Sequence, residues 1–197
     1  MNILIVYSHP SEDSYTFRIF KRLKEMLENQ NWDVQVSDLY ADHFNCILTA
    51  EEYLREGMKN PELPIPEDVL DEQKKIERAD CVIFIYPVWW SDCPAILKGW
   101  FDRVFSVGYA YGHSSQLAKM KTIKYGVVIC TAGHSNELLD DTGITQSMKM
   151  VMLEDRMGHR FKQKEMFILG GTLEMQNVME VHLAKLETVH ENIVKLC

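Results

Sequence analysis

Two adjacent tryptophans, Trp89 and Trp90, stand between a hydrophobic run at 81–86 and a helical pattern that begins near Pro94. The run has the length and the β-branched and aromatic content of a buried strand. Proline suits a first helical turn, because its missing N–H costs nothing there. Aromatic side chains in a strand-to-helix loop lie where open α/β sheets bind ligands. Neighbouring residues in an extended chain point in opposite directions, so we expect at least one tryptophan to face outside the core. The alternative is that both only cap the core.

A candidate anion site precedes this stretch, at residues 8–17. The segment connects an apolar run at 2–7 with a helix that Ser14 can cap. The free N–H groups and the positive dipole end of a helix N-terminus bind anions, and the Ser14 and Thr16 hydroxyls add donors. In the simpler interpretation, Ser14 is only the helix cap. The sequence contains neither the glycine fingerprint of dinucleotide-binding folds nor a P-loop, which weakens both of those interpretations.

A third candidate segment, Thr131-Ala132-Gly133, follows an apolar run at 123–131. Gly133 allows close approach of the backbone to a ligand, because it has no Cβ. The N–H groups of this segment are candidate hydrogen-bond donors. Considered alone, the segment is equally well explained as an ordinary turn.

These segments need a framework that places them together, and the order of the patterns supplies one. Strand-like and helix-like segments alternate five times, which favours a parallel sheet covered on both faces. We expect strands at 2–7, 32–36, 81–86, 123–131 and 165–169. We expect helices from Ser14, near 49–55, at 67–79, from Pro94, at 145–157 and at 174–196, with an irregular insertion at 41–66 and a loop at 132–143. Pro87 should end the ladder of the third strand, because proline has no N–H to donate.

Composition limits the class of protein. At 197 residues, with 46% hydrophobic and 25% charged residues, the chain suits one soluble domain spanning 1–197. The formal net charge of -8 argues against binding to nucleic acid or to an anionic membrane, and no apolar run is long enough to span a bilayer. No signal-type segment opens the chain, and five cysteines without a C-x-x-C pair suit reduced thiols in the cytoplasm. We expect no metal site and no hydrolase chemistry, because the sequence has neither metal-ligand spacing nor a nucleophile elbow.

A long, specific match to a known family runs from Pro87 to Tyr111. After Pro87 and Trp90 come P-A-I-L-K-G-W-F-D-R-V-F at 94–105 and Tyr-Ala-Tyr at 109–111. This stretch resembles the signature of the NAD(P)H:quinone oxidoreductases of the flavodoxin-like superfamily, and weaker similarity covers roughly the first two-thirds of the chain. The resemblance implies an α/β fold, a flavodoxin-like doubly wound five-stranded parallel sheet in the order 2-1-3-4-5 with helices on both faces. That order places the switch point between the first and third strands, so the His9 and Trp90 loops should be neighbours.

The resemblance also implies a flavin cofactor, FAD with FMN as the alternative, and assigns residues to it. Those expected at the phosphate and ribityl chain are His9, Ser14, Tyr15, Thr16 and Phe17. Those expected along the isoalloxazine are Pro87, Val88, Trp89 and Trp90, with Thr131, Ala132 and Gly133 at its pyrimidine side, where N–H groups would stabilise the anionic reduced flavin. Those expected in the substrate pocket are Trp90, Tyr111 and His113, the last in place of a second tyrosine.

By this resemblance the chain takes hydride from NADH or NADPH onto flavin N5 and passes two electrons to a quinone-like acceptor, with ping-pong kinetics. The family builds its pocket across a two-fold interface, so we expect a homodimer. An azo- or nitroreductase, a flavodoxin-type electron carrier and a regulatory subunit of a transport system remain as alternatives.

Two features depart from the long members of the family. Leu138 and Thr145 stand nearest to the Tyr and His that are thought to relay charge in those members, so no such relay is expected here. The insertion at 41–66 is shorter than its counterpart, which helps to hold adenine in FAD-binding members.

Overall fold

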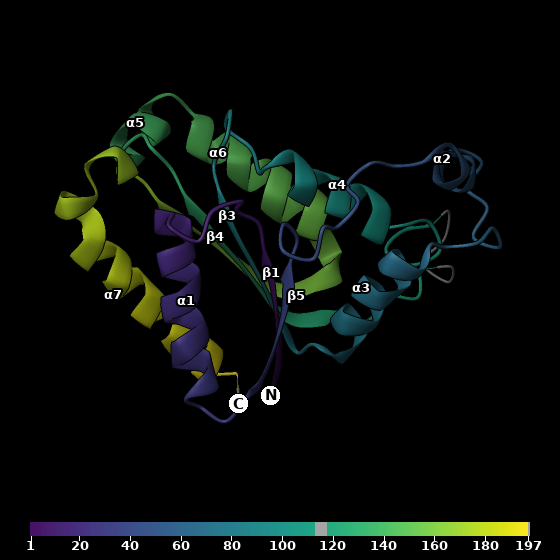
Figure 1. The fold of residues 1–197 in the computed structure, drawn as a ribbon, viewed down its shortest axis with the longest axis horizontal. Helices are drawn as coiled ribbons and strands as arrows, with labels where there is room; N and C mark the ends of the chain where they lie inside the picture. The colour runs from purple at the N-terminus through teal and green to yellow at the C-terminus, as the bar shows by residue number, and fades with distance from the viewer. Residues whose placement is uncertain (113–117, 197) are drawn as a thin grey trace.

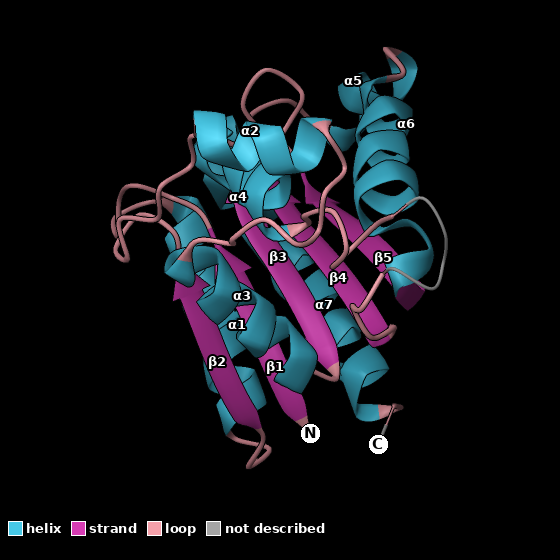
Figure 2. Cartoon of the chain, turned by 90° about the vertical axis from the view of Figure 1, so that its right-hand side faces the viewer, coloured by secondary structure: helices cyan, strands magenta, loops and turns pink. Residues whose placement is uncertain are grey.

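The computed structural model describes residues 1–112 and 118–196. Five parallel strands form one sheet in the order β2-β1-β3-β4-β5, as Figure 2 shows. The strands are β1 (Asn2–Tyr7), β2 (Asp33–Asp38), β3 (Cys81–Pro87), β4 (Ile123–Thr131) and β5 (Phe161–Leu169). The strand order predicted from the resemblance is confirmed.

Helices cover both faces of the sheet (Figure 1). One face packs against α1 (Tyr15–Glu28) and α7 (Met175–Val194), and the other against α3 (Glu67–Arg78), α4 (Ala95–Val104), α6 (Ile144–Lys149) and the π-helix η1 (Met150–Met157). The remaining elements are α2 (Ala50–Gly57), α5 (Asn136–Asp141), η2 (Gly158–Arg160) and η3 (Thr172–Glu174). Side chains of successive β1 residues enter opposite cores, because strand side chains alternate between faces. None of the helices that the structure describes has the length and apolar character needed to cross a bilayer.

Apart from small shifts at the ends of other elements, the structure differs from the sequence prediction at three places. Strand β5 begins at Phe161 rather than at 165, and the buried Phe161 is followed by exposed polar residues, which hid the start of the strand from a search for apolar runs. The loop expected at 132–143 contains the short helix α5, which Ser135 caps by accepting a hydrogen bond from the Leu138 amide. The helix expected at 145–157 is present, but from Met150 onward it has the i→i+5 hydrogen bonding of a π-helix.

The prediction that Pro87 ends the ladder of β3 is wrong. Pro87 is paired with Thr131, and the next amide, that of Val88, donates to the Thr131 carbonyl at 2.8 Å. On β3, the Ile85 carbonyl accepts the Ser8 amide on the β1 side. Pro87, two residues further on, turns its nitrogen toward that same side, where β1 has already ended at Tyr7. No ladder bond is lost there, which explains how the strand accommodates a proline.

Helix α4 holds the insertion in place through a buried arginine. The Arg103 guanidinium donates to Glu52 Oε1 at 2.7 Å, to both carboxylate oxygens of Asp68 at 2.5 and 3.1 Å, and to the Asn45 carbonyl at 2.6 Å. Its side chain is only 2% exposed. The Arg103 guanidinium also lowers the pKa of the Asp68 carboxyl by its hydrogen bond and its charge. A buried charge must be paired in this way, so Arg103 joins the insertion and α3 to α4.

Two further residues of the 94–105 motif serve the same contact. The backbone of Cys46 crosses α4 so closely that a Cβ on Gly99 would lie 2.0 Å from the Cys46 carbonyl oxygen. Trp100, fully buried, donates its indole N–H to Glu72 of α3 at 2.8 Å. The most specific motif of the sequence therefore packs the insertion and α3 onto the sheet.

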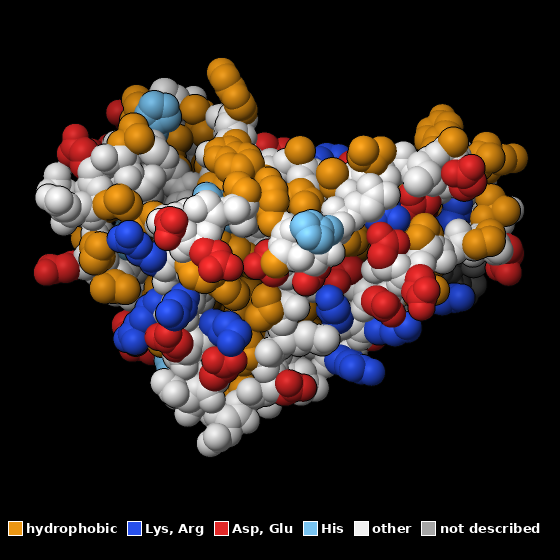
Figure 3. Space-filling view, in the orientation of Figure 1, with side chains coloured by type: hydrophobic (Ala, Val, Ile, Leu, Met, Phe, Trp, Pro, Cys, Tyr) orange, Lys and Arg blue, Asp and Glu red, His pale blue; other side chains and the backbone are white. Residues whose placement is uncertain are grey.

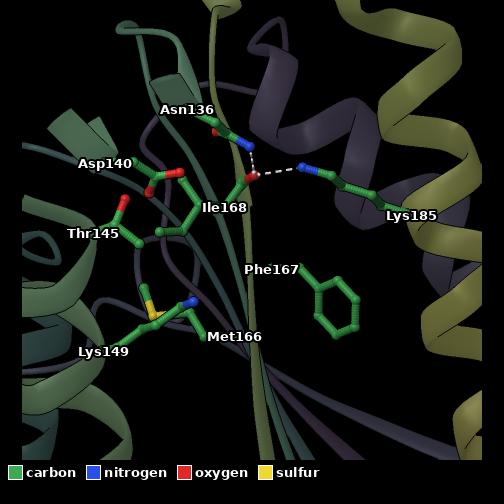
Figure 4. A pocket seen from close by; sticks show the side chains of 8 residues that line it. All are labelled: Asn136, Asp140, Thr145, Lys149, Met166, Phe167, Ile168 and Lys185. Atoms are coloured by element: carbon green, nitrogen blue, oxygen red, sulfur yellow. Dashed lines mark hydrogen bonds between the residues drawn. The ribbon is translucent and has the colours of Figure 1, made fainter. Parts of the chain in front are cut away.

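The outer edge of the sheet is protected at β5. Asn136 and Lys185 both donate to the Ile168 carbonyl, at 3.1 and 3.0 Å, as Figure 4 shows. Beside them a cavity of about 220 Å³ is lined by side chains of α5, α6, β5 and α7. These two bonds occupy one acceptor that this edge strand would otherwise offer to another chain.

Gly99→Ala should destabilise the fold, although alanine is favoured over glycine in a helix interior by about 1 kcal/mol. The added methyl group would collide with backbone at Cys46 rather than with a flexible side chain. We expect a loss of about 1–3 kcal/mol in the free energy of unfolding, as for other overpacked sites. Urea titration measures it. Gly57→Ala is the matched control, because its methyl group meets only the exposed Tyr53 ring. Equal stability of the two variants would contradict the role given to Gly99.

Candidate active site

Three connecting segments meet at the carboxyl edge of the central strands: residues 8–14 after β1, residues 88–94 after β3 and residues 132–135 after β4. The Thr16 and Thr131 hydroxyls are hydrogen-bonded at 2.7 Å, which ties the start of α1 to the end of β4. The ring centroids of His9 and Trp89 lie 6.2 Å apart. The prediction that the His9 and Trp90 loops are neighbours at the switch point is therefore confirmed. Figure 3 shows hydrophobic side chains gathered along this upper edge of the molecule.

The start of α1 has the features of an anion site. Ser14 is the N-cap and accepts the Phe17 amide at 3.0 Å. The amides of Tyr15 and Thr16 belong to the first turn, where helix geometry leaves N–H groups without an intrahelical partner. No acidic side chain lies in that turn, and Glu12 and Asp13 lie just before its cap. The positive end of the helix dipole favours an anion at this place. The N-cap role of Ser14 is confirmed. The cap is compatible with an anion site, because it leaves the next two amides available.

His9 Nδ1 makes two contacts with Ser11. It lies 3.0 Å from the Ser11 amide, which can donate to it, and 3.1 Å from the Ser11 carbonyl, to which it can donate. Burial lowers the pKa of the imidazole below its usual value, which favours the neutral ring. In the tautomer that accepts the Ser11 amide, Nε2 carries the proton and is the donor.

Two of the residues expected at the phosphate turn their hydroxyls elsewhere. Thr16 is 2% exposed and its hydroxyl is occupied by Thr131. The Tyr15 hydroxyl bonds to Nδ1 of the buried His182 on α7 at 2.8 Å, and His182 is further hydrogen-bonded to the Gly170 backbone. Their side chains fix the helix start to β4 and α7, and their backbone amides are the groups left for an anion.

Trp90 is carried on a tight turn of residues 89–92, which we call the tryptophan turn. The Trp89 amide donates to the Asp92 carbonyl at 2.9 Å, and the Asp92 amide donates to the Trp89 carbonyl at 3.1 Å. The two central residues, Trp90 and Ser91, have φ of 50° and 61°. Positive φ at both central positions matches a type I′ turn, which is usually built from Asn and Gly. A left-handed residue other than glycine costs roughly 1–2 kcal/mol, and such strain concentrates at functional sites.

The tryptophan turn puts aromatic surface into solvent. Trp90 is fully exposed and Trp89 is 43% exposed. The expectation that at least one tryptophan faces outside the core is confirmed, and the alternative that both only cap the core is wrong. With the start of α1 nearby, this edge offers an anion site next to a flat aromatic surface.

The segment after β4 is partly occupied by protein contacts. The Ala132 amide donates to the Leu169 carbonyl at 3.0 Å, and the Ala132 carbonyl accepts from the amide and hydroxyl of Thr172, each at 3.0 Å. The amides of Gly133 and His134 remain as candidate donors for a ligand. A Cβ on Gly133 would lie 3.3 Å from the Leu173 side chain, so this glycine also leaves room for η3.

Tyr111 lies with the insertion, and its hydroxyl donates to Glu56 of α2 at 2.6 Å. The Val107 amide donates to the same carboxylate oxygen at 2.8 Å. Burial raises the pKa of the Tyr111 hydroxyl, and so does the hydrogen bond to Glu56. The 40% exposed ring is the part of Tyr111 that can meet a ligand. His113, the other expected pocket residue, lies outside the described residues.

Sequence reasoning missed Asp92 and Arg156. Arg156 of η1 makes a two-point ion pair with Asp92, at 2.8 and 2.9 Å. Asp92 could have been suspected from its place directly after the two tryptophans and Ser91. Arg156 gives no local signal, because it comes 64 residues later in an ordinary helical pattern.

Comparison with known proteins places the chain among enzymes with related folds. A family model described as "Flavodoxin-like fold" matches residues 1–189. The structure of an NAD(P)H:quinone oxidoreductase from Methanothermobacter marburgensis is 42% identical, with a TM-score of 0.92, and the match covers 98% of this chain and 96% of that one. An uncharacterized NAD(P)H oxidoreductase from Haemophilus influenzae is 32% identical, over 89% of this chain and 86% of its own. The NAD(P)H dehydrogenase [quinone] 1 of Cavia porcellus is 33% identical over 76% of this chain, which spans 59% of that relative's length.

Acid should destabilise the protein through His182. Burial lowers the pKa of folded His182 below its usual 6.5, so the unfolded chain takes up the proton first as the pH falls. The stabilisation is present above about pH 6.5 and is lost below it. Urea unfolding at about pH 7.5 and about pH 5.5 measures the drop, which should be smaller in His182→Gln. His159→Gln, at an exposed histidine, should keep the full drop. The same pH dependence in all three proteins would contradict the assignment.

Proposed function

The chain belongs to the NAD(P)H:quinone oxidoreductase family of flavodoxin-like proteins, and on that premise we propose that it is a flavin-dependent NAD(P)H:quinone oxidoreductase. The observation that carries this proposal is the pairing, at the switch point of the sheet, of a free helix start with the exposed tryptophan turn. A flavin nucleotide combines the two matching groups, a phosphate and a planar ring. Open α/β sheets bind such ligands at this edge.

The residues of the three segments fit a flavin chemically. The Tyr15 and Thr16 amides and the His9 ring would hold the phosphate, and no carboxylate lies in the first turn of α1. The Val88 and Trp90 side of the site would lie along the isoalloxazine, and the Gly133 amide would meet its pyrimidine. A bound flavin supplies the hydride and two-electron chemistry. The role of the protein is to bind and orient it.

The proposed cofactor is FAD, with FMN as the alternative. The insertion is the segment that would have to meet an adenine. It is firmly attached through Arg103, Glu52 and Asn45, so it offers a fixed surface rather than a loose loop. Because the insertion is short, FMN remains the alternative cofactor. Identification of the cofactor released from the purified protein distinguishes FAD from FMN.

We propose NADH or NADPH as the donor and a quinone-like acceptor as the second substrate. Both present a flat ring that must approach within roughly 3–3.5 Å of the reacting atom. Trp90 would cover one such ring at a time, because of the two indoles at the site only that of Trp90 is fully exposed. The nicotinamide must then leave before the acceptor enters, which is the origin of ping-pong kinetics.

A homodimer would complete the pocket. Within the chain, the Tyr111 hydroxyl is bound to Glu56 of α2, a helix on the opposite side of the molecule from the start of α1 (Figure 1). In a two-fold assembly the Tyr111 ring of one subunit would face the site of the other. Sedimentation equilibrium at micromolar concentration tests this assembly, and a fully active monomer would refute it.

The alternatives differ in measurable ways. An azo- or nitroreductase would share the site, because flat electron-poor acceptors fit the same surface, and a comparison of acceptor turnover separates it. A flavodoxin-type carrier needs only an exposed flavin edge and would not oxidise NAD(P)H rapidly with menadione. A regulatory subunit of a transport system would co-purify with a membrane protein.

The purified protein should bind flavin, because the start of α1 and the tryptophan turn suit its phosphate and ring. The expected result is a yellow protein, or tight binding of added FAD or FMN. Absorbance spectra and mass spectrometry of the released cofactor measure it. A colourless protein that binds neither flavin in titration would contradict the proposed function.

Initial rates at several quinone concentrations should give parallel double-reciprocal plots, because one covered ring position serves both substrates in turn. The measurement is NAD(P)H oxidation with menadione as acceptor. Intersecting lines would mean that both substrates bind together, and that the single position at Trp90 is wrong.

A further inference from the structure

We propose that Arg156 is a positioning residue, which sets the place of Trp90 over the site by holding Asp92. The proposal deepens the proposed function and rests on it for the role of Trp90 as a cover of the substrate ring. The position of the tryptophan turn itself follows from contacts within the chain. The positioning role of Arg156 can therefore be tested separately from the proposed function.

The tryptophan turn needs an outside support. Burial does not stabilise the position of Trp90, because its side chain is fully exposed. Both central residues of the turn are in the left-handed conformation that bulky residues avoid. The two backbone bonds between Trp89 and Asp92 close the turn but do not fix its direction relative to the sheet. A strained, exposed turn persists only when its surroundings hold it.

Asp92 is where that support is attached. Its carboxylate accepts Arg156 Nη1 at 2.8 Å and Nη2 at 2.9 Å, and Oδ1 also accepts the Cys93 amide at 2.7 Å. The same residue supplies both backbone bonds that close the turn. Two parallel N–H···O bonds constrain direction as well as distance. Fixing the Asp92 carboxylate therefore fixes the last residue of the turn.

Arg156 is itself held rigidly. Its side chain is 8% exposed, whereas the Asp92 side chain is 45% exposed. The guanidinium lies 5.4 Å from the centre of the Phe101 ring on α4, and Nη1 approaches Met152 Sδ at 3.0 Å and Cys93 Sγ at 3.4 Å. The buried partner is thus the anchor, and the exposed partner is the group that it holds.

The anchor comes from a different crossover than the turn. Arg156 lies on η1, in the connection from β4 to β5, and the tryptophan turn lies in the connection from β3 to α4. η1 is a π-helix, and interruptions of this kind in α-helices are frequent at functional sites. The Asp92–Arg156 pair therefore joins η1 to the loop that carries Trp90. η1 follows residues 132–135, the third segment of the site, in the chain.

A spectroscopic experiment on the flavin-free protein tests the positioning directly. All four tryptophans are replaced by 5-fluorotryptophan, and Trp90→Phe assigns the Trp90 fluorine resonance. In Arg156→Met and in Asp92→Asn we expect the Trp89 and Trp90 resonances to shift or broaden, while Trp32, which lies far from the pair, keeps its resonance. Arg156→Lys keeps the charge but loses the two-point contact, so it should resemble Arg156→Met.

Kinetics of the flavin-loaded enzyme give the functional readout. A misplaced Trp90 should raise the KM of the acceptor roughly tenfold or more, with a smaller change in flavin affinity, because the proposed phosphate site at α1 is untouched. The double variant Asp92→Asn/Arg156→Met should be no worse than either single variant, since one contact is removed in all three. Arg22→Met is the matched control. It removes an exposed ion pair between α1 and α7 and should leave both readouts unchanged.

The outcomes separate the claims. Unchanged Trp89 and Trp90 resonances in folded Arg156→Met would overturn the positioning role. If Arg156→Met does not fold, the test uses Asp92→Asn, which changes the exposed partner of the pair. Unchanged Trp89 and Trp90 resonances in Asp92→Asn would also overturn the positioning role. Shifted resonances with an unchanged acceptor KM would overturn the link to substrate. A wild-type protein that binds no flavin would refute the proposed function. The fluorine spectra of the flavin-free protein would still test whether Arg156 holds the tryptophan turn.

Discussion

The requirement that buried charge be paired organises the half of the molecule around α4. Arg103 lies in the core of that half, where its guanidinium must find acceptors. It finds them on three separate segments: the start of α3, helix α2 and the loop at Asn45. Leaving such a charge unpaired costs about 3–5 kcal/mol, which is of the order of a domain's whole stability. The insertion therefore has one favourable place, across α4, where Gly99 leaves room for its backbone. The site depends on this arrangement, because α4 carries the tryptophan turn at its start.

A second buried arginine acts on the other side of α4. Arg103 faces the insertion and Arg156 faces the tryptophan turn, and each is bound to a carboxylate by two parallel hydrogen bonds. Both also lie against aromatic rings, of Phe44 and Phe101 respectively. Two buried charges thus lie on either side of the apolar surface of α4. One fixes the position of the insertion, and the other fixes the position of the tryptophan turn. Stability and the geometry of the site are supplied by the same kind of contact, which explains why residues far from the strand ends bear on Trp90.

Much of the framework could be predicted. Apolar runs located four of the strands, because buried parallel strands need continuous apolar sequence, and the alternation of apolar and polar residues located β2. Ser14 and the Trp89–Trp90 pair were found from local chemistry. The start of β5 was missed because an edge strand tolerates polar residues on its exposed side. The end of β3 was misplaced because the cost of Pro87 depends on which neighbour its nitrogen faces, and a single sequence does not contain that information.

The sequence by itself determined the order of elements, the capped start of α1 and the exposure of at least one tryptophan, since each follows from periodicity, capping or chain alternation within a few residues. Tertiary structure alone decided which polar groups of the site remain available to a ligand. It turned the Tyr15 and Thr16 hydroxyls to His182 and Thr131, gave the Ala132 amide to Leu169 and brought Arg156 to Asp92. These are contacts between segments tens of residues apart, and they exist because hydrogen-bonding groups that folding buries must be satisfied by whatever partners the packing brings near.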